Sequence, residues 1–175
     1  MIPPATGLSL RRVESPLGRV LLVAAGGRLR GLYFEGQRDE PDPGRLPCSA
    51  ECVRRDDATL LARASEQLHE YFEGRRRRFE LPLDLVGTPF QREVWQALLE
   101  IPSGATRAYG EIAARIGRPS AVRAVGGAIG RNPVSIVVPC HRVIGSDGSL
   151  TGFGGGLPRK RALLGIEGVL PPSLL

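Results

Sequence analysis

The stretch that decides the fold of the second half of the chain is Asn132-Pro133-Val134-Ser135-Ile136-Val137-Val138-Pro139-Cys140-His141-Arg142-Val143. The apolar run 134–138 predicts a short β segment. Pro139 interrupts this segment because proline lacks the N–H of a continuing ladder, which favours a turn that exposes the Cys140 thiol. A thiolate is the reactive form of cysteine, and a neighbouring imidazole can generate it. The stretch therefore predicts a nucleophilic cysteine, although a lone intracellular cysteine is more often a small buried hydrophobic residue.

His141 follows Cys140 directly, and adjacency alone does not make a catalytic pair. Successive side chains of an extended strand point to opposite faces. His141 therefore serves Cys140 only if the backbone bends or a water molecule bridges the two side chains. A third group must also orient the imidazole, and Glu167 is a candidate for that group.

A glycine-rich loop is predicted after this stretch, over 146–156, and a last helix over 158–166. Gly152 and the glycines at 154–156 make the loop suited to form one wall of a pocket beside Cys140. The last helix carries Leu163, Leu164 and Ile166 and ends before Glu167.

Two short helices are predicted before the central stretch, over 109–116 and 121–130, with a turn at 117–120. Two brief helices joined by a tight glycine-containing turn are typical of a helix-turn-helix. The second helix is lined by residues with almost no side-chain bulk, and its two glycines lower helix stability. Two interpretations account for this pattern. The small residues allow either close packing against the domain core or close approach to DNA, with Arg123 as the one long side chain that projects.

A domain boundary is predicted between residues 86 and 87, which gives domains 1–86 and 87–175. Directly after it, Thr88-Pro89-Phe90-Gln91 combines an N-cap, a proline at the first helical position and a capping-box glutamine. A buried helix face is expected to follow, with Trp95 in the core rather than in a ligand site.

The N-terminal domain is predicted to be rich in β structure. The apolar runs 19–24 and 29–34 are separated by Gly26-Gly27, which indicates a hairpin, and 35–55 is expected to form a long surface loop. From residue 57 the apolar spacing becomes helical and continues to Phe72. The run 75–78, four arginines, predicts a solvated turn, with DNA contact as the alternative, and the alternation over 79–85 predicts a strand.

The composition favours a DNA-binding protein only weakly. The net charge is +6, and a basic surface concentrates polyanions, but charge alone leaves nucleic-acid binding open. No apolar run approaches bilayer length and 1–4 begins no secretory signal, so we expect a cytoplasmic protein without a membrane partner. Of the three cysteines, Cys48 and Cys52 form with His69 a poor zinc pattern, and no metal is expected.

Several segments in the same order resemble the O6-alkylguanine-DNA alkyltransferases: 109–130 with 123–127 inside it, 132–143, 152–156 and 159–168. The resemblance is strong from about 88 to 168, whereas the N-terminal part fits only in layout. It implies an α+β protein in which a small, β-rich, ribonuclease-H-like domain with one helix precedes a mainly helical domain with a helix-turn-helix. It also implies action on double-stranded DNA containing O6-alkylguanine, without a cofactor and as a monomer. Activity on O4-alkylthymine and cooperative binding to DNA are left open.

The resemblance implies a role for each matching residue. Cys140 is the irreversible acceptor of the alkyl group, His141 takes the thiol proton through a water molecule, and Glu167 holds the imidazole. Tyr109 donates a hydrogen bond to the departing base, and Asn132 orders the turn that joins the DNA-binding helix to the active site.

The resemblance also implies minor-groove binding with the damaged nucleotide rotated out of the duplex. The residues expected on the DNA are Arg123, Tyr109, Ala121, Ala124, Gly126, Gly127 and Arg131. The pocket for the extruded base is expected to include Val143, Pro139, Phe153, Gly154 and Gly155. Some relatives carry Tyr and Ser where Phe153 and Gly154 stand here, which makes this loop less polar and leaves sensitivity to bulky guanine inhibitors open.

Three other classes of protein are weighed against this interpretation. Alkyltransferase-like damage binders lack the acceptor cysteine, whereas Cys140 is present here. Cysteine hydrolases usually have their cysteine and histidine far apart in the sequence. A transcription regulator would read base edges poorly with so small and uncharged a second helix.

Overall fold

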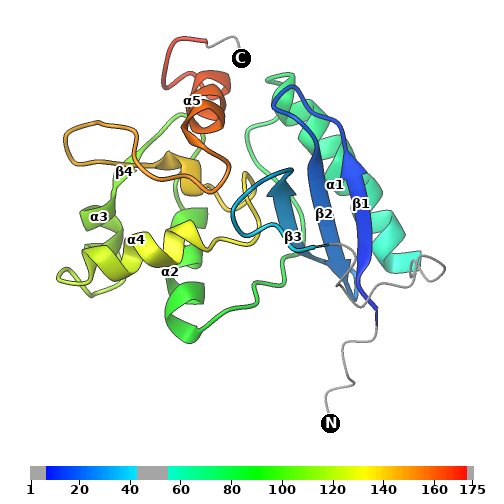
Figure 1. Cartoon of the computed structure of the whole chain (residues 1–175), viewed down its shortest axis with the longest axis horizontal. Coiled ribbons are helices and arrows are strands. Elements are labelled where there is room, and N and C mark those ends of the chain that lie inside the picture. Colours follow the sequence, from blue (N-terminus) through cyan, green and yellow to red (C-terminus); the bar gives the residue numbers. More distant parts are fainter. Residues whose placement is uncertain (1–6, 43–54, 173–175) are drawn as a thin grey trace.

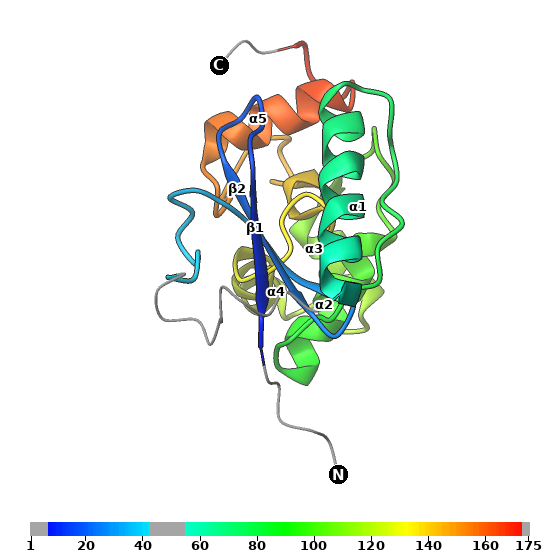
Figure 2. The same ribbon diagram turned by 90° about the vertical axis from the view of Figure 1, so that its right-hand side faces the viewer.

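The N-terminal part of the chain forms a three-stranded antiparallel sheet covered by one helix (Figure 1). The computed structural model describes residues 7–42 and 55–172. The strands are β1 (Ser9–Val13), β2 (Val20–Ala25) and β3 (Arg28–Phe34), in the order β1-β2-β3, and the helix is α1 (Arg55–Phe72). Figure 2 shows α1 running alongside the sheet on one of its faces.

The predicted hairpin and helix are both confirmed. Gly26 and Gly27 have positive φ angles of 58° and 73°, the conformation that a two-residue hairpin turn with a matching twist requires. Buried Asp57 then joins the helix to the sheet, because it accepts hydrogen bonds from the Ser9 hydroxyl (2.9 Å) and the Gly27 N–H (2.7 Å). Part of the predicted loop over 35–55 lies outside the described residues.

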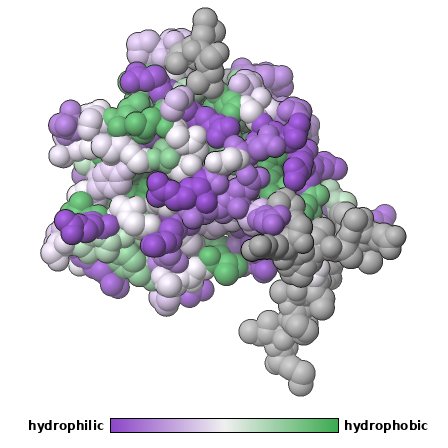
Figure 3. All heavy atoms as spheres, viewed as in Figure 1, coloured by the Kyte–Doolittle hydropathy of each residue, from purple (hydrophilic) through white to green (hydrophobic). Residues whose placement is uncertain are grey.

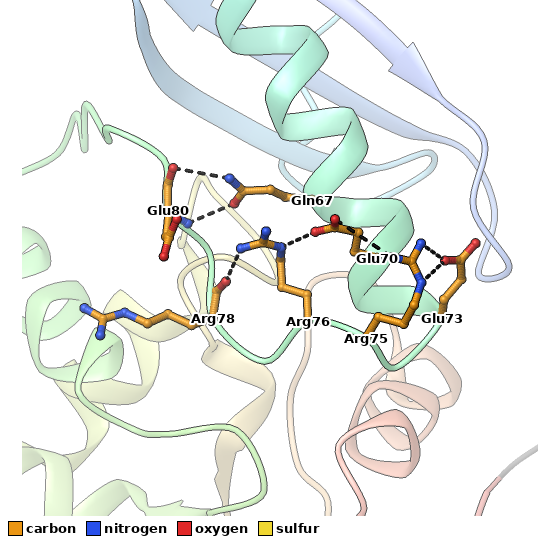
Figure 4. A network of polar contacts seen from close by, with 7 residues as sticks. All are labelled: Gln67, Glu70, Glu73, Arg75, Arg76, Arg78 and Glu80. Atoms are coloured by element: carbon orange, nitrogen blue, oxygen red, sulfur yellow. Dashed lines mark hydrogen bonds and ion pairs between the residues drawn. The ribbon is translucent and has the colours of Figure 1, made fainter.

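The arginine run forms a solvated turn, as predicted. Arg75 is exposed and pairs with Glu73, while Arg76 binds Glu70 with its Nε 2.5 Å from Glu70 Oε2 (Figure 4). These ion pairs hold the turn against the C-terminal end of α1.

The strand predicted over 79–85 is wrong, since the segment has only an isolated bridge, between Leu29 and Leu83. The Gln67 side chain instead forms hydrogen bonds with both backbone polar groups of Glu80 (Figure 4). It accepts from the Glu80 N–H at 2.9 Å and donates to the Glu80 carbonyl at 3.3 Å. Pro82 offers no N–H for a ladder. A side chain and a proline therefore replace strand pairing.

The C-terminal part is mainly helical, as predicted. Its elements are α2 (Pro89–Leu99), β4 (Arg107–Ala108), α3 (Tyr109–Arg115), α4 (Val122–Gly130), the 3-10 turn η1 (Cys140–Arg142), β5 (Val143–Ile144) and α5 (Leu157–Ile166). β4 and β5 form a short parallel pair. Trp95 is buried in the core, and its indole N–H donates to the Ala128 carbonyl at 2.9 Å, which joins α2 to α4.

The capping box at the start of α2 is complete. Gln91 N–H donates to the Thr88 hydroxyl at 3.2 Å, and Thr88 N–H donates to the Gln91 side chain at 2.9 Å. We expect Thr88→Ala to lower the free energy of unfolding by about 1 kcal/mol in urea titrations, because one helix N–H loses its acceptor. Thr59→Ala, at an exposed position inside α1, is the control and should cause no such loss; equal stability of Thr88→Ala and the parent would contradict the cap.

The β segment predicted over 134–138 is also wrong. Only Val134 makes a bridge, to Leu32 of β3. The backbone then turns, with Ile136 at a φ of 70° and the Val138 N–H donating to the Val134 carbonyl at 2.9 Å. Asn132 holds the turn closed, because its side chain donates to the Val138 carbonyl (2.8 Å) and accepts from the Val134 N–H (2.9 Å).

The two parts of the chain are in contact across β3. Leu32 N–H donates to the Pro133 carbonyl at 2.9 Å, and Ser135 N–H donates to the Leu32 carbonyl at 2.9 Å. The turn that leads to Cys140 is thus fastened to the N-terminal sheet. The domain boundary between residues 86 and 87 stays a prediction.

The surface in Figure 3 is largely hydrophilic or intermediate, with only scattered hydrophobic patches. Among the described residues, no helix combines the length and apolar character needed to cross a bilayer.

Candidate active site

Cys140 begins the 3-10 turn η1, so the predicted turn at Pro139 is present. The thiol is not exposed as expected, however, because Cys140 retains only 6% of its accessible surface. Burial raises the pKa of the Cys140 thiol, while a hydrogen bond from Asn132 and the charge of Lys160 act in the opposite direction. A thiolate at this position therefore needs a base close by.

His141 lies beside Glu167, with its Nε2 2.7 Å from Glu167 Oε1. The 3-10 turn supplies the backbone bend that an extended strand would lack. When Nε2 carries the proton and donates to Glu167, Nδ1 has a free lone pair. Nδ1 is buried and accepts no hydrogen bond from any residue that the structure describes. Burial lowers the pKa of His141 although Glu167 raises it, so the neutral imidazole can act as a base.

Glu167 ends α5, and four hydrogen-bond donors surround its carboxylate. Its Oε1 lies 2.8 Å from the Tyr71 hydroxyl and 2.9 Å from Arg142 Nη2, in addition to His141, and its Oε2 lies 2.9 Å from Arg142 Nε. Burial alone would raise the pKa of Glu167, but the hydrogen bonds from His141 and Arg142 outweigh it and hold this pKa far below its usual range. Glu167 therefore carries a full negative charge at neutral pH.

Arg142 and Tyr71 were missed by the sequence reasoning. Arg142 is next to His141 in the sequence, but nothing in the sequence shows that its side chain is buried. Tyr71 lies 96 residues away from Glu167 along the chain, in the N-terminal helix α1, and no sequence pattern points to that contact.

Lys160 is a third buried group that the sequence reasoning missed. Its Nζ donates to the carbonyls of Val143 (2.5 Å) and Thr151 (2.7 Å), so it joins β5 to the glycine-rich loop. Burial lowers the pKa of Lys160 to about 8, although the neighbouring Cys140 acts to raise it. The one available signal is that Lys160 is the sole lysine of the chain.

The glycine-rich loop packs against the end of β3. The Phe153 ring meets Phe34 edge-on, with the ring centroids 6.3 Å apart. A Cβ atom at Gly154 would lie 3.3 Å from the Gln37 amide nitrogen, and one at Gly155 would lie 3.0 Å from the Phe34 ring. Glycine at both positions therefore lets the loop approach the N-terminal domain closely.

A cavity of about 340 Å³ lies between this loop and α4. Its lining includes Tyr109, Gly126, Gly127, Arg131, Phe153 and Gly154, all predicted site residues, together with Arg38 and Asp39 from the N-terminal domain. The Tyr109 hydroxyl donates to the Thr151 carbonyl at 3.2 Å. Pro139 and Val143 are buried and do not line this cavity; Pro139 lines a separate one of about 750 Å³ with Arg77 and Arg78.

Helix α4 presents two different faces. Val125, Ala128 and Ile129 are buried in the core, which accounts for one of the small residues by packing. Arg123, Ala124 and Gly127 are exposed, and Ala121 is half-buried. Packing alone does not require small residues at the exposed positions, so this face is suited to close approach by an external surface.

Two residues of the poor zinc pattern in the sequence, Cys48 and Cys52, lie outside the described residues. His69 is exposed in α1. Within 7–42 and 55–172, no group of three or more histidine, cysteine, aspartate or glutamate side chains is arranged to hold a metal ion.

Two family models match the chain. The 6-O-methylguanine DNA methyltransferase ribonuclease-like domain matches residues 11–85, and the DNA binding domain of the same family matches residues 89–169. A methylated-DNA–protein-cysteine methyltransferase of Mycobacterium bovis is 47% identical over 163 residues, covering 93% of this chain and 94% of that protein. One of Haemophilus influenzae is 42% identical, covering 93% of this chain and 87% of that protein.

Solved structures agree with these matches. The crystal structure of Mycobacterium tuberculosis OGT in complex with DNA has a TM-score of 0.77 and 48% identity, covering 90% of this chain and 91% of that chain. An O6-methylguanine DNA methyltransferase of Methanococcus jannaschii has a TM-score of 0.65 at 25% identity, covering 94% and 96%. The α+β fold expected from the sequence, with a ribonuclease-like N-terminal domain and a helical DNA-binding domain, is confirmed. The chain belongs to the 6-O-methylguanine DNA methyltransferase family.

Proposed function

We propose that this protein repairs DNA by transferring the alkyl group of O6-alkylguanine irreversibly to the sulfur of Cys140. The observation that carries the proposal is the buried cluster of Cys140, His141 and Glu167 in a chain of this family. A thiol with a raised pKa needs a neutral base, and the lone pair on His141 Nδ1 provides one.

The chemistry is a single displacement. The Cys140 proton passes through a water molecule to His141 Nδ1, and the sulfur bonds to the alkyl carbon as the bond from that carbon to the guanine O6 breaks. Glu167 stabilises the imidazolium that forms, and Tyr109 donates a hydrogen bond to the base as negative charge develops on it. The product is a thioether, so each molecule acts once and needs no cofactor.

Asn132 and Lys160 support this site without touching the substrate. Asn132 closes the turn between α4 and Cys140, and Lys160 ties β5 to the loop that carries Phe153. The base is received against this loop, with Gly154 in the lining of the cavity and Gly155 directly behind it. Pro139 and Val143, predicted for the same pocket, are buried outside that cavity.

The DNA is held on the exposed face of α4. Because an alkyl group inside the stacked duplex is out of reach of a surface side chain, the damaged nucleotide is rotated out towards the cavity of about 340 Å³, which Tyr109 and Phe153 line. Cys140 itself is buried and does not line this cavity. Arg123 fills the vacated position in the stack, and the small face and Arg131 contact the minor groove. The face consists of Ala121, Ala124, Gly126 and Gly127. The proposal includes a cytoplasmic, monomeric protein with domains 1–86 and 87–175.

Intact-mass measurement tests the proposal. After incubation with a duplex carrying O6-methylguanine, we expect one added methyl group per molecule, mapped to the peptide that contains Cys140. Cys140→Ser is the control and should gain no mass. Turnover beyond one equivalent would indicate a hydrolase, and no transfer would indicate a damage binder or a DNA-binding regulator; either result would overturn the proposal.

A further inference from the structure

Tyr71 joins the N-terminal domain to the carboxylate of the active site. This residue lies in the last turn of α1 and is 1% exposed, with its ring packed against Phe72 and Phe79 at centroid distances of 5.5 and 5.4 Å. Its hydroxyl donates a 2.8 Å hydrogen bond to Glu167 Oε1. A buried tyrosine hydroxyl needs a polar partner, but a backbone carbonyl would serve equally well. The partner here is the group that orients His141.

Tyr71 and His141 share one oxygen atom. Glu167 Oε1 receives the Tyr71 hydroxyl, His141 Nε2 at 2.7 Å and Arg142 Nη2 at 2.9 Å. Each donor on a carboxylate oxygen draws on its negative charge and makes that oxygen a weaker acceptor for the others. The strength of the contact between His141 and Glu167 therefore depends on the Tyr71 hydroxyl.

We propose that Tyr71 is a positioning residue of the alkyl-transfer site, which fixes Glu167 Oε1 and limits how strongly Glu167 stabilises the charged form of His141. The inference rests on the proposed function, because it assigns His141 the role of base. It also makes the chemistry of the C-terminal domain depend on a helix of the N-terminal domain.

The charged and titratable groups around His141 come from three elements. Glu167 and Lys160 belong to the α5 region, Cys140 and Arg142 belong to η1, and Tyr71 reaches Glu167 from α1. Arg142 and Lys160 oppose protonation of His141 by their positive charge, and they stay in place when only the Tyr71 hydroxyl is removed. Burial raises the pKa of Tyr71 well above its usual value, so this side chain remains a neutral donor throughout the working pH range.

Tyr71→Phe keeps the ring in place and removes one donor from Glu167 Oε1. More of the carboxylate charge then acts on the imidazole, so we expect the pKa of His141 to rise by about 0.5 to 1. A base that must be neutral to accept a proton then loses activity on the acid side. The acid limb of the alkyl-transfer rate should move upward by the same amount, which lowers the rate on that limb about 3- to 10-fold.

Two measurements on the full chain test this inference. The first follows the imidazole resonances by NMR between pH 4 and 9, without DNA. The chain has two histidines, and the exposed His69 serves as the internal reference. The second measures single-turnover methyl transfer from an O6-methylguanine duplex across pH 5.5 to 8.5. Tyr33→Phe removes a hydroxyl from half-buried Tyr33 of β3 and is the matched control, expected to change neither curve.

An unchanged His141 titration in Tyr71→Phe would overturn the inference, and so would a His141 that titrates in neither protein. A transfer rate that falls by the same factor at every pH, with the midpoint of the pH profile unchanged, would mean that Tyr71 only packs in the core. That result would overturn the inference as well. The NMR titration needs no substrate. A parent protein that transfers no methyl group therefore contradicts the proposed function, while the His141 titration still decides the role of Tyr71.

Discussion

Glu167→Gln is expected to lower the free energy of unfolding by about 3–5 kcal/mol, because it leaves the guanidinium of Arg142 buried without a counter-charge. Arg142 is 6% exposed, and its acceptors would be the Ile101 carbonyl, 2.5 Å from Nη1, and the new amide oxygen, neither of which carries a charge. A neutral amide accepts fewer strong hydrogen bonds than a carboxylate. Urea unfolding at pH 7 measures the loss.

The matched control is Glu93→Gln. Glu93 pairs with Arg118 at 3.2 Å, but its side chain is 41% exposed, and removing such a surface pair should change stability by less than about 1 kcal/mol. Replacing Arg142 as well, in Glu167→Gln/Arg142→Met, should restore part of the loss because the unpaired charge is gone. A Glu167→Gln protein within 1 kcal/mol of the parent would contradict the assigned ion pair.

The same carboxylate predicts how stability varies with pH. Its pKa in the folded protein lies far below the value of about 4.3 expected for the unfolded chain, so the unfolded chain binds its proton first as the pH falls. The stabilisation is therefore complete above about pH 5 and is lost progressively at lower pH. The difference in stability between the parent and Glu167→Gln should shrink accordingly below about pH 4.

Arg123→Ala is expected to slow repair in duplex DNA about 10- to 100-fold while leaving reaction with free O6-methylguanine base nearly unchanged. An exposed arginine that replaces the extruded nucleotide offsets an unstacking cost of a few kcal/mol, and that cost arises only in the duplex. Single-turnover rates on the two substrates measure the split.

Arg63→Ala is the control for this comparison. Arg63 is an exposed arginine of α1, so its removal lowers the net charge equally without altering α4. It should slow neither reaction more than about twofold. Equal losses on both substrates in Arg123→Ala would show that Arg123 does not act as the wedge.

The fold was predictable where local chemistry decides the structure. The Gly26-Gly27 turn and the Thr88 capping box act within a few residues, and both are present in the structure. The two strands that were predicted wrongly have one cause in common: side chains hydrogen-bond to backbone groups that a strand would pair. Gln67 binds the backbone of Glu80, and Asn132 binds that of Val138, and such contacts leave no alternating or apolar signature.

The candidate site was predictable in its reactive atoms and not in their surroundings. Cys140 and His141 stand together in the sequence, and Glu167 is a candidate by its place after the last predicted helix, to which the family resemblance then assigns a role. Tyr71 reaches the site through a contact that spans 96 residues of sequence, and the burial of Lys160 appears only once the loop and the last helix are folded together. For the same reason burial of the thiol was not foreseen: a turn after proline exposes a side chain only if no other element covers it.

The contact between Tyr71 and Glu167 bears on protein synthesis. The ribosome makes Tyr71 first, then Cys140, and Glu167 only 27 residues after the nucleophile. A nascent or truncated chain that stops before Glu167 contains the thiol but neither the carboxylate nor the tyrosine contact that completes the cluster. The cluster of Cys140, His141 and Glu167 is therefore complete only once synthesis has passed the end of α5.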